Sequence, residues 1–142
     1  MPVHSTHSPA AVQAAREEIA VQIRAYRDLV GAASKASGMS LTRIDAALAV
    51  FEPAFFNNLL VALDARFAGR PDEPGPSAET RVLADSLMHH GGVLTVRAGP
   101  PYDPQACVLR IDRGDRIGLN ADDFESLCAA FLAAMEKPPA GG

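Results

Sequence analysis

The sequence has no tryptophan, only two cysteines and almost no lysine, and each shortage excludes something. Two cysteines cannot form the disulfide framework of a small secreted domain, so we interpret Cys107 and Cys128 as small buried hydrophobes. Aromatic residues make up 6% of the chain, so aliphatic side chains and six phenylalanines must supply the core. A chain of 142 residues can bury such a core as one domain without cross-links.

Basic residues are also few and scattered. The formal net charge is −4 at pH 7, and no segment concentrates arginine or lysine. Nucleic-acid binding needs a basic surface that neutralises phosphates, so it is disfavoured. It would require a dimer that gathers Arg24, Arg27, Arg43 and Arg66 on one surface.

The N-terminus "MPVHSTHSPAAV" lacks the charged start and apolar block of a signal peptide. Uninterrupted apolar runs stay well below the ~20 residues of a membrane span. The sequence therefore predicts a cytoplasmic protein with no membrane association. We expect a flexible N-terminal arm at 1–7, a single globular domain at 8–136 and a frayed tail at 137–142.

Alanine is the most abundant residue and favours helix, and the first half of the chain has clear helical periodicity. Ser8 followed by proline, with apolar residues recurring from Val12 to Ala33, predicts an amphipathic helix of about 22 to 25 residues. Ser40 can cap a second helix, which Pro53 either kinks or divides. The stretch "PAFFNNLLVALDARFAG" is apolar on most sides, as is typical of a central helix.

The second half changes period. Ser77 can cap a third helix that ends at Gly91 and Gly92, where glycine accepts the left-handed conformation. The segments "VLTVR", "CVLRI" and "RIGL" alternate with period 2 and predict short strands. Asn120, with Asp123 three residues later, resembles a capping box that opens the last helix. The predicted fold class is α+β, mostly α: four to five helices with a small antiparallel β-sheet of two to three short strands inserted before the C-terminal helix.

His89 and His90, at the end of the third helix, form one candidate site for a ligand or partner. His90 shares the inward helix face with Ser86, whereas His89 lies off its edge. Histidine titrates near neutrality and can act as a base or a ligand. The structural alternative, which we favour, is that His90 bonds free carbonyls at the helix end and interacts with the helix dipole.

Asn57 and Asn58 form the second candidate site, because asparagine competes for backbone hydrogen bonds inside a helix. One interpretation is a structural hydrogen bond to a loop or a neighbouring helix. The other is a polar anchor in a ligand pocket or a protein interface. Tyr102, in "PPYDP", could be presented to a partner from a rigid loop.

No catalytic or metal motif accompanies these residues. The sequence has no G-x-S-x-G, no glycine-rich phosphate loop, no paired cysteines and no HExxH. A metal needs three or four convergent ligands. His4 and His7 would join His89 or His90 only if the N-terminal arm folded back, and nothing in the spacing requires this. We therefore predict no metal and no cofactor.

Roughly the last 50 residues carry a family resemblance. The order "GGVLT", "VL", "GD.I.L" and a closing helix with "DF..L..AF" resembles a family of small actinobacterial proteins of unknown function, and "FEPAFFNNLL" fits the same pattern. These motifs are a helix stop, a hairpin turn and an N-cap. The resemblance therefore implies a fold and carries over no catalytic residue.

The sequence favours a non-catalytic helical protein that acts by protein–protein interaction, with a homodimer as its simplest form, because alanine-rich surfaces let helices approach closely. The alternative is a small-molecule-binding protein or a small enzyme. Its pocket would lie at the helix–sheet junction, around Asn57, Asn58, Ser86 and His90. Whether the protein is an enzyme stays open at this point.

Overall fold

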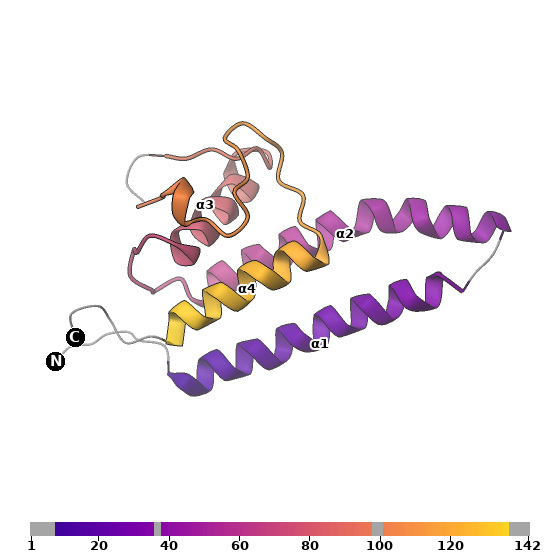
Figure 1. Cartoon of the computed structure of the whole chain (residues 1–142), viewed down its shortest axis with the longest axis horizontal. Helices are drawn as coiled ribbons and strands as arrows, with labels where there is room; N and C mark the ends of the chain where they lie inside the picture. The colour runs from indigo at the N-terminus through magenta and orange to yellow at the C-terminus, as the bar shows by residue number, and fades with distance from the viewer. Residues whose placement is uncertain (1–7, 36–37, 98–100, 137–142) are drawn as a thin grey trace.

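The computed structural model describes residues 8–35, 38–97 and 101–136. Its helices are α1 (Pro9–Ala33), α2 (Gly38–Arg66), α3 (Pro76–His89) and α4 (Ala121–Glu136), with a 3-10 turn η1 (Pro104–Ala106) between the last two. Figure 1 shows α1 and α2 as a long antiparallel hairpin, with α4 lying along part of it. Both α1 and α2 continue past the start of α4.

The first helix begins and ends close to where the sequence predicts. The Ser8 hydroxyl accepts a hydrogen bond from the Ala11 N–H at 3.1 Å, and Pro9 occupies the first turn. Val12 and Ile23 are buried on the inner face of α1. The predicted amphipathic helix is confirmed, and its length of 25 residues is the upper limit of the expectation.

The second helix is a single helix of 29 residues with Pro53 inside it. Pro53 therefore does not start a new helix, although it removes one backbone donor from the ladder. Ser40 lies within the helix and is not its N-cap. Ser77 likewise lies in the first turn of α3, and Gly75 takes the N-cap position with φ +99°.

The predicted antiparallel sheet is wrong, because the described part of the chain contains no β-strand. Residues 93–97 and 107–119 run as extended segments and turns. They share one isolated antiparallel bridge, between Val93 and Arg116. The fold is mostly helical, and the α+β class does not hold.

Side chains from the helices supply the backbone partners that a neighbouring strand would supply. Ser86 on α3 accepts from the Thr95 N–H at 3.0 Å and donates to the Thr95 carbonyl at 3.2 Å. Asn57 on α2 donates to the Ile117 carbonyl and accepts from the Leu119 N–H, both at 3.2 Å. Ser86 reproduces the two bonds that paired residues exchange in an antiparallel ladder, because both go to the same residue. Asn57 instead bonds the two residues on either side of Gly118. Alternation with period 2 reports an extended, half-buried backbone and does not identify its partner.

The core lies where the four helices meet. The Phe56 ring, fully buried, lies 5.0 Å from the Tyr26 ring and 5.6 Å from the Phe124 ring. Cys107 and Cys128 are buried and free, as the sequence predicts. Burial raises the pKa of the Cys128 thiol to about 12, so this side chain is a neutral hydrophobe at pH 7.

Candidate functional site

The candidate residues from the sequence do not gather into one site. The amide of Asn57 faces the 117–119 segment, and the hydroxyl of Ser86 faces Thr95. Asn58 is exposed on another face of α2. Tyr102 is half-buried beside Cys107, and burial raises the pKa of its phenol. Asn57 and Ser86 thus have backbone partners, which leaves Asn58 as the exposed member of the pair of asparagines.

The two histidines lie in different surroundings. The His90 backbone N–H donates to the Ser86 carbonyl at 2.9 Å, so His90 is the C-cap of α3. Its side-chain Nε2 lies 3.3 Å from Asp85 Oδ2, outside hydrogen-bond geometry. His90 therefore ends the helix through its backbone, while its ring faces a carboxylate. His89 is exposed.

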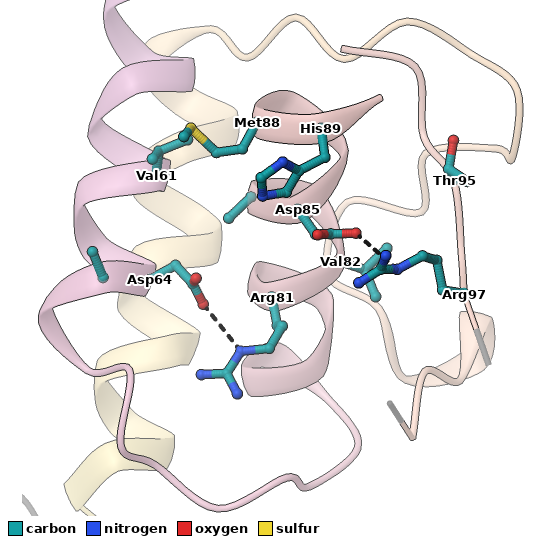
Figure 2. A pocket seen from close by; sticks show the side chains of 11 residues that line it. Val61, Asp64, Arg81, Val82, Asp85, Met88, His89, Thr95 and Arg97 are labelled. Atoms are coloured by element: carbon teal, nitrogen blue, oxygen red, sulfur yellow. Dashed lines mark hydrogen bonds and ion pairs between the residues drawn. The ribbon is translucent and has the colours of Figure 1, made fainter. Parts of the chain in front are cut away.

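A cleft of about 370 Å³ lies between α2, α3 and the extended segment after α3 (Figure 2). Its walls combine apolar and charged side chains: Val61, Asp64, Ala65, Arg81, Val82, Ala84, Asp85, Met88, His89, Thr95 and Arg97. Among the six candidate site residues, only His89 lines this cleft.

The charged groups of the cleft are paired within the fold. Arg81 Nε lies 3.4 Å from Asp64 Oδ1, and Arg97 Nε lies 3.5 Å from Asp85 Oδ2 (Figure 2). Each carboxylate is thus neutralised by an arginine, and each arginine is already engaged. In the part of the chain that the structure describes, His89 alone among the cleft's ionisable groups has no charged partner. One exposed histidine does not make a catalytic constellation.

The densest polar cluster centres on Arg70, which the sequence analysis did not single out. Its side chain is 1% exposed and lies just after α2. The guanidinium donates to Asp64 Oδ1 at 2.6 Å, to the Phe67 carbonyl at 3.0 Å and to Ser77 Oγ at 2.7 Å. It also lies 4.9 Å above the Phe131 ring. Arg70 therefore closes the end of α2, holds the first turn of α3 and covers α4.

Glu79 is a second buried charge to which the sequence analysis assigned no role. It is 2% exposed, and its carboxylate accepts from the Val108 N–H at 2.7 Å and the Leu109 N–H at 2.9 Å. Burial raises the pKa of Glu79, and these backbone donors lower it by less. Glu79 thus holds the 107–110 segment against α3 through hydrogen bonds to its backbone, as Ser86 holds the backbone of Thr95. The signal in the sequence was an acidic residue on the inward face of a helix.

Changing Glu79 to glutamine is expected to alter how stability depends on pH. The pKa of Glu79 is raised in the folded protein, so its contribution to stability is complete below the ordinary glutamate pKa. That contribution is lost as pH rises through the raised pKa. Urea unfolding from about pH 4 to pH 8 should show the wild type losing stability relative to Glu79→Gln as pH rises.

The matched control is Glu73→Gln, because Glu73 is exposed in the turn before α3. This variant should follow the wild-type pH profile. If the stability of the wild type and of Glu79→Gln changed with pH in parallel, burial would not raise the pKa of the Glu79 carboxyl.

The second helix carries a long apolar stretch and is poorly covered. Residues Thr42–Arg66 are long and apolar enough to cross a membrane by length and composition alone, and their most apolar 18-residue window has a mean hydropathy of 1.6. Only 17% of the most apolar 18-residue window is buried. The stretch that the sequence predicts to be a central helix does pack against α1, α3 and α4, but its outer face, with Ala54, Asn58 and Ala62, is exposed. Counting uninterrupted apolar runs overlooked this stretch, because isolated polar residues interrupt it.

Four exposed residues of α1 and six of α2, all but one of them apolar, share one side of each helix, and we call this side the hairpin face. It consists of Val21, Ala25, Leu29 and Ala32 on α1 and Ala47, Phe51, Ala54, Asn58, Ala62 and Ala65 on α2. At 100° per residue, each set falls within an arc of about 80°. Glu18 falls within the α1 arc, and an ion pair of 2.8 Å between Arg66 and Glu18 joins the two helices there.

The large exposed hydrophobic side chains also concentrate on α1 and α2. In residues 8–35, 38–97 and 101–136 they are Val21, Leu29, Val30, Val50, Phe51, Met88 and Val108, and the first five lie on these two helices. Three of these five, Val21, Leu29 and Phe51, belong to the hairpin face, whereas Val30 and Val50 lie outside it. Single exposed hydrophobic residues are ordinary, whereas a contiguous group marks an interaction surface.

No protein-family model, curated protein or solved structure matches this chain. The resemblance of the C-terminal region to actinobacterial proteins therefore stays a prediction. In the described segments, no group of three or more His, Cys, Asp or Glu side chains could hold a metal ion. His4 and His7 lie outside those segments. The function has to be argued from the fold itself.

Proposed function

We propose that this chain is a non-catalytic helical protein of the cytoplasm that acts by binding another protein through the hairpin face. The observation that carries this proposal is the poor coverage of α2, a long apolar helix of which only 17% of the most apolar 18-residue window is buried. The largest contiguous apolar patch on a protein surface is often a site of association. An exposed apolar helix face gains free energy when a partner removes it from water.

A protein partner fits α2 better than a membrane does. The Glu52 carboxylate accepts from the Ala121 N–H at 3.1 Å, and Asn57 bonds the 117–119 segment. Insertion of α2 into a bilayer would break these bonds and place Glu52 in hydrocarbon, where a charge is expensive. Binding through the hairpin face leaves both polar groups with their partners.

Small-molecule binding, the alternative function, has the cleft between α2 and α3 as its supporting feature. The arginines Arg81 and Arg97 face this cleft but are paired with Asp64 and Asp85. A ligand carboxylate or phosphate would have to displace these carboxylates. The proposal therefore assigns function to the hairpin face and not to the cleft.

A photo-reactive benzophenone amino acid in place of Ala62 is expected to cross-link this chain to a protein in intact cells. Ala62 is exposed within the hairpin face. Ser126 provides the matched control, because it is exposed on α4 away from that face. Gel electrophoresis and mass spectrometry of the irradiated chain identify what each probe captured. A lipid adduct at Ala62, or no adduct beyond those at Ser126, would overturn the proposed function.

A further inference from the structure

The α2 part of the hairpin face is complementary to itself in size. Phe51 lies seven residues before Asn58, and Ala65 lies seven residues after it. Ala54 and Ala62 lie four residues before and after Asn58. If a second α2 runs antiparallel with Asn58 facing Asn58, Phe51 of each copy meets Ala65 of the other. At these two contacts a large side chain faces a small one, which avoids a clash. Ala54 of each copy faces Ala62 of the other, and these small side chains let the two backbones approach.

Asn58 is the one polar residue of the hairpin face, and its amide is suited to pair with itself. In the described part of the chain its side chain makes no hydrogen bond to its own fold, whereas Asn57 makes two. An amide carries both an acceptor oxygen and donor hydrogens. Two identical amides across a two-fold axis can donate to each other, and a lone asparagine in an apolar seam fixes the register of paired helices.

Charge and area are also compatible with a second copy. Glu18 is the one charged residue of the described chain that falls within the arcs of the hairpin face, and it already pairs with Arg66. Two such faces can therefore meet without burying an unpaired charge. The hairpin face spans residues 21–32 of α1 and 47–65 of α2, which is on the order of 450 Å² at 1.5 Å per residue and a helix width of ~10 Å. This is roughly half of the ~800 Å² that each partner buries in a standard interface, a size typical of a weak, reversible dimer.

We propose that the protein forms a homodimer in which the hairpin faces of two copies pack across a two-fold axis. In this dimer, α2 runs antiparallel to α2 of the second copy, and Asn58 lies at the axis. This inference rests on the proposed function and adds to it the identity of the partner, the orientation of the helices and the register.

Cysteine cross-linking tests the position of the axis. The purified Asn58→Cys chain, oxidised in air with copper phenanthroline, is expected to give at least about ten-fold more covalent dimer than Ser126→Cys, since a disulfide needs Cα atoms about 4.4–6.8 Å apart. Cys107 and Cys128 are 7% and 4% exposed, so the native thiols should contribute little. A stable dimer of the Asn58→Cys chain that forms no disulfide between its two copies would overturn the inference.

A size swap tests the register. Ala65→Phe would place two large side chains against each other and should weaken dimerisation at least about ten-fold. Phe51→Ala together with Ala65→Phe restores a large side chain facing a small one and should recover wild-type affinity within about three-fold. Sedimentation velocity measures the dissociation constants, and circular dichroism confirms that each variant is folded. A double variant no tighter than Ala65→Phe would overturn the antiparallel register.

A monomeric wild type at high concentration would also overturn the homodimer. The proposed function has a separate outcome in the benzophenone experiment. An adduct at Ala62 between this chain and a different protein would sustain the proposed function while excluding the second copy. An adduct between two copies of this chain would support both the proposed function and the homodimer.

Discussion

Replacing Arg70 by alanine is expected to lower the free energy of unfolding by about 3–5 kcal/mol, the range for breaking a buried ion pair from one side. The variant would leave the Asp64 carboxylate without its closest cation, at 2.6 Å. It would also leave Ser77 Oγ and the Phe67 carbonyl without this donor. Urea unfolding followed by circular dichroism at pH 7 measures the difference.

Arg97→Ala is the matched control, because Arg97 is also an arginine paired with an aspartate. Its side chain is 65% exposed, against 1% for Arg70. Water screens an exposed pair, so this variant should change the free energy of unfolding by no more than about 1 kcal/mol. Arg70→Lys should not recover wild-type stability, because one ammonium group cannot reproduce the several hydrogen bonds that the planar guanidinium donates. Equal losses for Arg70→Ala and Arg97→Ala would contradict the role given to Arg70.

Replacing Asn57 by alanine is expected to cost about 2–3 kcal/mol, because two partly buried backbone groups lose their partners at once. These groups are the Ile117 carbonyl and the Leu119 N–H. Urea unfolding measures the total cost. Hydrogen exchange locates it, because the Leu119 amide should exchange faster in the variant relative to the amides of α1.

The control for Asn57 is Gln105→Ala, which removes an amide side chain from an exposed position in η1. A surface change of this kind should stay within about 0.5 kcal/mol. Unchanged exchange at Leu119 in the Asn57 variant would show that the 117–119 segment is held by apolar packing and not by the amide.

Several helix boundaries could be predicted because their signals are local. Ser8 and Asn120 each accept from the backbone N–H three residues later, at 3.1 and 2.7 Å. Gly91 and Gly92 have φ of +64° and +79°, where glycine avoids the strain that other residues incur. Ser77 was wrongly predicted to be the N-cap of α3. Its hydroxyl instead accepts a hydrogen bond from the Arg70 guanidinium.

The candidate sites were harder to predict, because a polar residue in an apolar helix has several explanations. The sequence identified Asn57 and Asn58 as unusual but left open whether they serve structure or binding. The structure separates them: Asn57 bonds a segment 60 residues away, and Asn58 is exposed. Arg70 gave no comparable signal, since a charged residue in a proline-rich turn is expected on the surface.

The sequence by itself determined which segments are helical, because caps, periodicity and glycine act within a few residues along the chain. Only the tertiary structure decided what the segments between α3 and α4 bond to. Their partners are Asn57, Glu79 and Ser86, and two of these bonds span 29 and 60 residues. Tertiary packing also decided which face of α2 stays open. An apolar pattern shows that a face avoids water, and only the arrangement of the other helices shows whether they cover it.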